Sequence, residues 1–286
     1  MLFRSPVRHL LGEMTAAAVL MQSNIKFNGA LVMQIFGDGP LKLAVVEVQP
    51  DLSVRATAKV VGNIDGAQTL STMVNVNNAG RCAITLDPLT KLPGQQPYQG
   101  VVPLFDDHRN KIDRFSDVLQ HYMLQSEQLD ITLVLAADDT SAAGLLIQRL
   151  PIKGEGNLAA KATMADEDEI GRNEDYNRIS ILAASLKSEE LLQLDANTIL
   201  RRLFWEEKLI RLETLVPRFA CSCSRDRVSN MIRSLGADEV ESILSERKDV
   251  EVGCDFCGQQ YKFDAVDAAQ IFTSVDKQVP GSSAIQ

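Results

Sequence analysis

The sequence has 286 residues and a mass of 31.4 kDa, enough for one large domain and a smaller second one. Hydrophobic residues make up 45% and charged residues 23%, as in an ordinary globular protein with a sizeable core. The net charge of −9 disfavours nucleic acid or an anionic membrane as a partner, and no apolar run reaches the roughly 18 residues of a membrane span.

Residues 6–22 are apolar enough to be mistaken for a signal peptide, but their pattern favours a helix of the folded protein. Glu13 interrupts the apolar stretch, and no A-x-A cleavage site follows it. We therefore expect a cytoplasmic protein.

Strand patterns dominate residues 25–151. Asn28-Gly29 predicts a hairpin turn between apolar runs, and Gly37-Asp38-Gly39-Pro40 predicts a second turn. Strands are expected at residues 31–36, 41–48, 54–61, 81–86, 99–104, 131–136 and 143–150. Apolar residues at helical spacing predict a helix over residues 113–129. This succession predicts an α+β fold whose N-terminal domain, residues 1–165, is a mostly antiparallel sheet with helices.

The composition changes after the predicted sheet domain. Residues 165–176 carry six acidic side chains, which predict a surface loop. Residues 177–212 are rich in leucine and predict helices, with Ser188 and Asp195 as N-caps. We expect the apolar stripe of these helices to pack on the sheet domain, so that residues 166–216 form an acidic loop and a helical linker.

Four of the five cysteines form two close pairs near the C-terminus: Cys221 with Cys223, and Cys254 with Cys257. A structural Zn²⁺ takes four thiolates in a tetrahedron, about 2.3 Å from the metal, and each pair can supply two neighbouring corners. We therefore predict one zinc per reduced chain, in a C-terminal module of residues 217–272. A helix capped by Ser224, a second helix over residues 237–247 and a hairpin of residues 250–252 and 260–263 are expected there. The tail, residues 273–286, is predicted to be disordered.

Other uses of these cysteines fit less well. Structural disulfides are typical of secreted chains. A zinc ribbon that binds nucleic acid or another protein is the main alternative. Residues 217–265 hold seven Lys and Arg against nine Asp and Glu, a net charge of −2 that opposes phosphate binding. A thiol oxidoreductase using Cys254 and Cys257 would lack a thioredoxin-like βαβ setting and would leave the other pair without a role.

The sequence predicts no catalytic residue and no enzyme activity. None of His9, His108 and His121 accompanies a recognisable nucleophile, and no Walker motif is present. Cys82 lies in a strand pattern, where a single cysteine is usually a core residue.

Several motifs distributed along the sequence occur together in one known protein family. They are Pro6-Val-Arg-His-Leu-Leu-Gly-Glu13, Gly37-Asp-Gly-Pro40, Tyr98-Gln-Gly100, Gln125-Ser-Glu-Gln-Leu129, Arg201-Arg-Leu-Phe204, Cys221-Ser-Cys-Ser-Arg225 and Cys254-Asp-Phe-Cys-Gly258. With them the sequence resembles the redox-regulated bacterial chaperones of the heat-shock protein 33 family. The family usually has a further strand and helix before the first motif. Either the start codon is placed late here, or the N-terminal sheet and the family's dimer contacts are altered.

The resemblance implies that Cys221, Cys223, Cys254 and Cys257 are zinc ligands in the reduced state. It also implies that oxidation forms the disulfides Cys221–Cys223 and Cys254–Cys257, a pairing that proximity along the chain favours as well. Zinc then leaves, the C-terminal region unfolds, and apolar surface is exposed to unfolded client proteins. The implied protein is an ATP-independent holdase that forms a homodimer when oxidised and needs neither nucleic acid nor a membrane.

Overall fold

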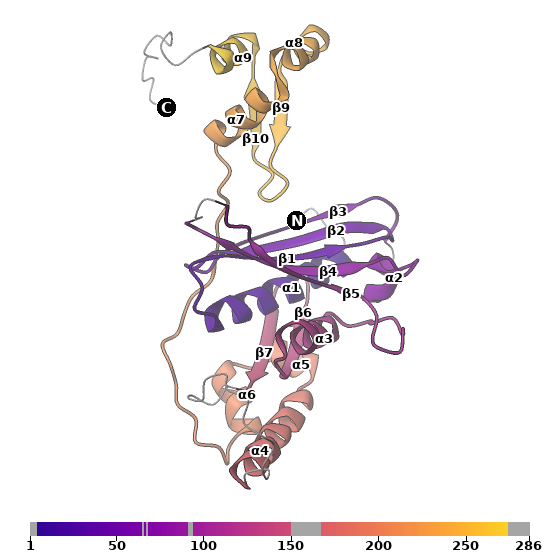
Figure 1. Ribbon diagram of the computed structural model, residues 1–286, viewed down its shortest axis with the longest axis vertical. Helices are drawn as coiled ribbons and strands as arrows, with labels where there is room; N and C mark the ends of the chain where they lie inside the picture. Colours follow the sequence, from indigo (N-terminus) through magenta and orange to yellow (C-terminus); the bar gives the residue numbers. More distant parts are fainter. Residues whose placement is uncertain (1–4, 65, 67, 91–93, 150–166, 274–286) are drawn as a thin grey trace. The chain divides into compact units, whose positions relative to one another are not determined.

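The computed structural model describes residues 5–64, 66, 68–90, 94–149 and 167–273 (Figure 1). The chain forms two compact units, Met1–Phe219 and Ala220–Gln286. Among the described residues, no helix combines the length and the apolar character that a membrane span requires.

A six-stranded sheet forms one layer of the first unit, with the strand order β5-β4-β1-β2-β3-β8. Its strands are β1 (Gly29–Phe36), β2 (Leu41–Val48), β3 (Ser53–Val60), β4 (Arg81–Pro88), β5 (Tyr98–Pro103) and β8 (Arg218–Phe219). Neighbouring strands are antiparallel except for the short pair β3–β8. The predicted α+β fold with a mostly antiparallel N-terminal sheet is therefore confirmed, and the predicted strands differ from the observed ones only at their ends.

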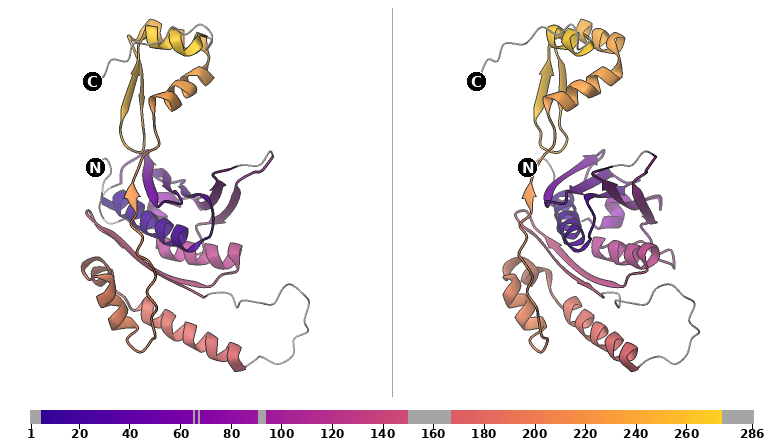
Figure 2. Two further views of the ribbon diagram at one scale, coloured as in Figure 1. Left: turned by 90° about the vertical axis from the view of Figure 1, so that its left-hand side faces the viewer. Right: turned by 60° about the vertical axis from the view of Figure 1, so that its left-hand side comes forward.

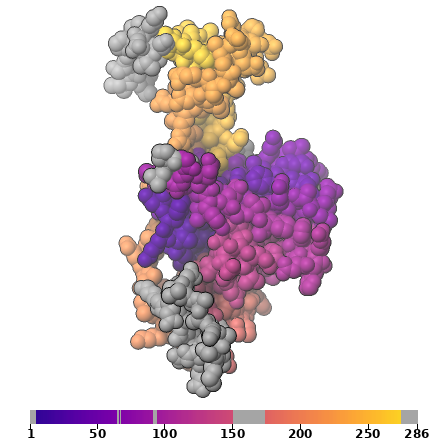
Figure 3. Space-filling view, viewed as in Figure 1, coloured from indigo at the N-terminus to yellow at the C-terminus, as the bar shows by residue number. Residues whose placement is uncertain are grey.

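Helix α1 (Ser5–Asn24) lies between this sheet and a second, two-stranded sheet made of β6 (Ile131–Ala137) and β7 (Ala142–Gln148), as Figure 2 shows. Its buried positions recur every three or four residues, and Met14, Ala17 and Ala18 are completely buried. Helices α2 (Leu70–Val74) and α3 (Phe115–Glu127) complete the main core. In the space-filling view, side chains close the gaps between these ribbons (Figure 3).

The predicted hairpin turn at Asn28-Gly29 is wrong. Asn28 is the last residue of the segment that connects α1 to β1, and Gly29 is the first residue of β1. A Cβ atom built on Gly29 would lie 2.3 Å from the carbonyl oxygen of Asp87 in the neighbouring strand. Glycine is required here for the close approach of β1 to β4, a requirement that looks the same in the sequence as a turn.

Three helices follow the sheet domain: α4 (Glu167–Ala184), α5 (Ser188–Gln193) and α6 (Ala196–Leu203). The predicted acidic loop is wrong from Glu167 onward, where the chain is helical; Ala165 and Asp166 lie outside the described residues. Acidic residues are favourable in the first turns of a helix, so a run of them does not by itself indicate a loop.

The caps and the end of this helical region also differ in part from prediction. Asp195 is the N-cap of α6 as expected, but the N-cap of α5 is Lys187 and not Ser188. The predicted helix to residue 212 is wrong, because helical structure ends at Leu203. The next residue, Phe204, is the C-cap, with a non-helical backbone and a buried side chain, and residues 205–217 are irregular.

The linker helices pack on the β6–β7 hairpin, as expected of their apolar stripe. They do so through a small cluster that is separate from the main core. Its buried members are Ala136, Leu186, Leu191 and Ile199. After the irregular segment, the chain returns to the sheet at β8. There the amide of Arg218 donates to the carbonyl of Leu52 (3.1 Å), and its guanidinium lies 2.7 Å from the carboxylate of Asp51.

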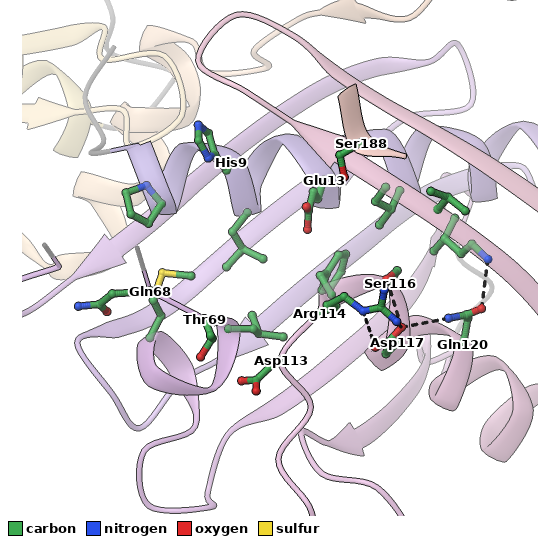
Figure 4. Close-up of a pocket in the computed structure, with 18 of the residues that line it drawn as sticks. His9, Glu13, Gln68, Thr69, Asp113, Arg114, Ser116, Asp117, Gln120 and Ser188 are labelled. Atoms are coloured by element: carbon green, nitrogen blue, oxygen red, sulfur yellow. Dashed lines mark hydrogen bonds and ion pairs between the residues drawn. The ribbon is translucent and has the colours of Figure 1, made fainter. Parts of the chain in front are cut away.

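A cavity of about 980 Å³ opens inside the first unit between α1, α2, α3 and β6 (Figure 4). Glu13 projects into it from α1, with Arg114 on the wall. Burial raises the pKa of Glu13 to about 7, although the charge of Arg114 acts in the opposite direction. Glu13 is thus a half-buried carboxyl whose charge is unfavourable in the folded unit.

The second unit has a core of its own. It contains α7 (Arg225–Leu235), α8 (Ala237–Glu246), β9 (Val250–Gly253), β10 (Gln260–Phe263) and α9 (Ala265–Phe272). Ile232, Val240 and Phe263 are its most deeply buried side chains. The two predicted helices and the hairpin are present, whereas α9 was not predicted. The tail predicted to be disordered lies, from residue 274 onward, outside the described residues.

Candidate metal centre

The second unit brings the four paired cysteines together. Cys221 and Cys223 lie just before α7, where the Ser224 hydroxyl accepts a hydrogen bond from the amide of Arg227 (3.2 Å) and caps the helix. Cys254 and Cys257 lie in the turn between β9 and β10. The helix start and the hairpin therefore each present one pair.

The hairpin turn is shaped to hold two sulfurs side by side. The amide of Cys254 donates to the carbonyl of Gln259 (2.9 Å), and the amide of Gly258 donates to the carbonyl of Cys254 (2.8 Å). Gly258 has a φ of +75°, in the left-handed region that glycine adopts without strain. These bonds close a tight loop around Cys257, so its sulfur and that of Cys254 face the first pair.

The four sulfur atoms all lie within 4.8 Å of one another. The Sγ atoms of Cys221 and Cys254 are 3.6 Å apart, and those of Cys223 and Cys257 are 3.4 Å apart. A tetrahedron of sulfurs about 2.3 Å from a central Zn²⁺ has edges of about 3.8 Å. All four are free thiols, so the donor set has both the chemistry and the spacing of a four-cysteine zinc site.

Crowding at the site makes the Cys257 thiol difficult to ionise without a cation. A backbone hydrogen bond at Gln259 lowers the pKa of the Cys257 thiol, but its contacts with the other cysteines, led by Cys223, together with desolvation raise it to about 12. Like charges held this close oppose one another, and a bound cation reverses the balance. The arrangement therefore favours a divalent metal ion.

Contacts besides a metal also hold the site. The hydroxyl of Tyr261 donates to Cys223 Sγ at 3.1 Å, and this bond, more than desolvation, raises the pKa of Tyr261 to about 12. The guanidinium of Arg225 lies 4.2 Å from the centre of the Phe263 ring and 2.7 Å from the carboxylate of Asp267. Arg225 thereby ties the start of α7 to β10 and α9.

Sequence analysis missed both Tyr261 and Arg225. For Tyr261 a signal was available: it lies two residues before Phe263, and alternate residues of a strand share a face. A tyrosine beside a core phenylalanine in a strand that follows two cysteines is therefore placed to reach their site. Arg225 carries no comparable signal, because its partners come from elements far along the chain.

The remaining residues considered in the sequence lie in the first unit. Cys82 is completely buried in β4, where desolvation raises its pKa to about 12. His9 lies 3.3 Å from the carboxylate of Asp139, and His108 and His121 belong to the loop after β5 and to α3. Within the described residues, the four C-terminal cysteines are the one cluster of three or more side chains that could hold a metal ion.

The chain matches the family model described as "Hsp33 protein" over residues 3–264. It belongs to the Hsp33 family. The resemblance inferred from the sequence motifs is therefore confirmed.

Similar proteins support this assignment of the Hsp33 family. A 33 kDa chaperonin of Chromobacterium violaceum is 45% identical over 266 residues, which are 93% of this chain and 81% of that protein. A 33 kDa chaperonin of Methylobacillus flagellatus is 41% identical, over 95% of this chain and 84% of that protein. The crystal structure of the 33 kDa chaperonin of Thermotoga maritima matches the fold with a TM-score of 0.70 at 20% sequence identity. The match covers 93% of this chain and 84% of the Thermotoga maritima chain. That last match supports the fold.

Proposed function

We propose that this Hsp33-family chain is an ATP-independent holdase chaperone that oxidation of four cysteines switches on in the cytoplasm. One observation carries the proposal: four free thiols converge in a small unit that follows the docked apolar linker in the chain. The name chaperonin, given to the similar proteins, supports the client-binding role.

In the reduced state, Cys221, Cys223, Cys254 and Cys257 hold one Zn²⁺. When bound, Zn²⁺ would keep its four sulfur ligands deprotonated and would join the start of α7 to the β9–β10 hairpin. A zinc thiolate remains a nucleophile, so the site that stabilises the unit is also the site that an oxidant attacks.

Hydrogen peroxide is a suitable oxidant. A thiolate sulfur attacks one peroxide oxygen, the O–O bond breaks, hydroxide leaves, and the sulfur becomes a sulfenic acid. The other thiolate of the pair attacks that sulfur, an S–S bond forms, and a second hydroxide leaves. With two protons, each pair transfers two electrons to one peroxide and yields two waters.

The expected disulfides are Cys221–Cys223 and Cys254–Cys257. All four sulfurs start within 4.8 Å, so distance in the folded unit does not choose between partners. Once one pair is oxidised its sulfurs are no longer thiolate ligands, and the zinc is released. Neighbours along the chain then remain close, whereas cysteines of different pairs separate, because loop closure costs more for distant residues.

Loss of zinc unfolds the second unit, because its own core is small. Structural zinc contributes about 10–16 kcal/mol in finger peptides, as much as the whole stability of many domains, about 5–15 kcal/mol. The linker helices depend on a second small cluster against β6 and β7, and they are connected to the second unit only through the irregular segment and β8. When the second unit unfolds, the C-terminal end of this connecting segment is no longer held by a folded unit, and the linker helices are released from β6 and β7.

Release of the linker supplies an apolar binding surface. The irregular segment after α6 already exposes large apolar side chains, including Trp205 (76%), Ile210 (81%) and Leu212 (81%). The buried leucines of the linker helices would add to them. A contiguous apolar patch of this kind binds unfolded client proteins and prevents their aggregation. We expect a homodimer in this oxidised state and no role for nucleic acid or a membrane.

The deciding experiment measures zinc content and the aggregation of a thermally unfolding client, before and after peroxide treatment, in the absence of ATP. Oxidised protein should suppress light scattering, and reduced, zinc-loaded protein should be weak. A Cys82→Ser variant is the matched control, because Cys82 is buried in the core of the first unit and should leave the switch unchanged. Equal activity of the reduced and oxidised forms would contradict redox control. Inactivity of both would favour a zinc ribbon with a binding partner.

A further inference from the structure

One contact of the metal centre has no part in the switch described above: the hydrogen bond between Tyr261 and Cys223. The hydroxyl of Tyr261 lies 3.1 Å from Cys223 Sγ, and both side chains are partly buried. Tyr261 belongs to β10, in the hairpin that carries Cys254 and Cys257, whereas Cys223 belongs to the segment before α7. The bond therefore joins the two halves of the site without passing through the metal.

Packing of β10 holds the tyrosine in place. Tyr261 pairs with Val252 across the hairpin, and its ring packs against the core of the second unit. Phe263, on the same face of the strand, is 1% exposed and lies under the guanidinium of Arg225, which also donates to the carbonyl of Lys262 (2.9 Å). The packing of the strand thus sets the position of the hydroxyl.

A hydroxyl donor has a defined effect on a thiolate ligand. Hydrogen bonds to an ionised acceptor are stronger than neutral ones, so the bond stabilises the sulfur in its charged, metal-binding form. It also draws electron density from the sulfur and lowers its nucleophilicity towards an oxidant. Partners of this kind, one step from the metal, orient the ligand and adjust its reactivity in many metal sites.

We propose that Tyr261 is a positioning residue of the metal centre, which holds Cys223 Sγ in place for the metal and makes that sulfur slower to react with electrophiles. The inference deepens the proposed function and rests on it, because it takes Cys223 to be a zinc ligand. Cys257, by contrast, is exposed. Cys223 and Cys257 therefore differ in their protection, although their sulfurs share one site.

The test compares the full-length, reduced, zinc-loaded wild-type chain with a Tyr261→Phe variant. The substitution removes only the hydroxyl and keeps the ring that packs against the core. Tyr98→Phe is the matched control, since the Tyr98 hydroxyl donates to Glu127 (2.8 Å) in the first unit. Zinc affinity, measured by competition with a chromogenic chelator, should fall about tenfold in Tyr261→Phe and stay constant in Tyr98→Phe.

A second readout separates positioning from a merely structural role. Limited alkylation of the zinc-loaded chain, followed by mass mapping, gives the ratio of modified Cys223 to modified Cys221 within one molecule. This ratio should rise several-fold in Tyr261→Phe, and the thiolate-to-metal charge-transfer band of the Co²⁺-substituted chain should shift. General loosening of the unit would instead increase modification of all four cysteines together and leave the ratio unchanged.

An unchanged ratio with unchanged affinity, or a uniform increase at all four cysteines, would overturn the role of Tyr261 and leave the proposed function standing. A wild-type chain that binds neither zinc nor Co²⁺ would overturn both. The metal content of the wild-type chain thus distinguishes the two failures.

Discussion

Each of the four cysteines supplies one corner of the candidate site, so removing one pair should abolish metal binding. We expect the reduced wild-type chain to contain one zinc, and a Cys254→Ser, Cys257→Ser double variant to contain almost none, because two thiolates hold zinc far more weakly than four. Metal analysis of the purified proteins measures this, with Cys82→Ser as the control that keeps its zinc. A wild-type content near zero, or no loss in the double variant, would contradict the assignment.

The carboxyl of Glu13 makes the stability of the first unit depend on pH. Its pKa is about 7 in the folded unit, against an ordinary 4.5. Below pH 4.5 the carboxyl is protonated in both states and costs nothing. As the pH rises towards 7, the unfolded chain releases the proton and the folded unit retains it, so stability is lost, by up to about 3 kcal/mol above pH 7. Because the side chain is only half-buried, we expect about 2 kcal/mol.

Glu13→Gln removes this ionisation. The variant should unfold at higher urea concentration than the wild type at pH 8 and at nearly the same concentration at pH 4.5, as followed by circular dichroism. Glu206→Gln, which changes an exposed glutamate, is the control and should have little effect at either pH. Equal effects of Glu13→Gln at both pH values would show that the charge of Glu13 is not what burial disfavours.

For single residues, the sequence identifies the candidate metal ligands but not the side chains that surround them. The spacing of the cysteines identifies the donor set, because each pair is local in the chain. The bond from Tyr261 to Cys223 joins residues that are 38 positions apart and depends on the register of the β9–β10 hairpin. Glu13 could be noticed only as an interruption of an apolar helix, since the cavity around it is built from elements far along the chain.

Among the elements, the linker helices decide how readily the apolar surface is released. Leu191 is 6% exposed in the small cluster between α5 and the β6–β7 hairpin. Leu191→Ala should weaken this docking, since such truncations cost about 2–5 kcal/mol. We therefore expect the reduced variant to suppress client aggregation better than the reduced wild type.

The matched control makes the same change at Leu209, which is 53% exposed in the irregular segment after α6. Leu209→Ala should leave the docking of the helices unchanged. If hydrogen exchange shows that the linker is undocked in Leu191→Ala while the reduced variant remains inactive, release of the linker is not what activates the protein.

The sequence predicts a helix or strand best where the hydrophobic pattern along the chain matches the face that the element buries. Alternation identifies β2 and helical spacing identifies α3, because each element buries one regular face in the main core. The start of α4 was missed because a run of acids resembles a loop. The helix was extended too far beyond Leu203 because the leucine-rich pattern continues into side chains that the fold leaves exposed, such as Leu209 and Leu212.

For the whole molecule, the division into two units predicts that oxidation acts regionally. Oxidised protein should lose amide protection from about residue 177 onward and keep it within residues 25–149, because the main core contains no residue of the second unit. Hydrogen exchange with mass spectrometry measures both regions in one sample, with reduced, zinc-loaded protein as the reference. Uniform loss across both regions would show that the units do not unfold separately.

The short strand β8 has a consequence for self-association. It occupies the edge of the six-stranded sheet beside β3 with two residues and one ion pair to Asp51, which is solvent-exposed and therefore adds little stability. Cys221 follows two residues later in the chain, so once the second unit unfolds, β8 would be the last anchored segment before an unfolded stretch. Ser53 and Val54 would then lose their partner strand, which lengthens the uncovered edge of β3, and an uncovered edge strand is a template on which another extended chain can pair. Rapid return of β8 after reduction would therefore protect the chaperone from adding its own sheet to the aggregates that it prevents.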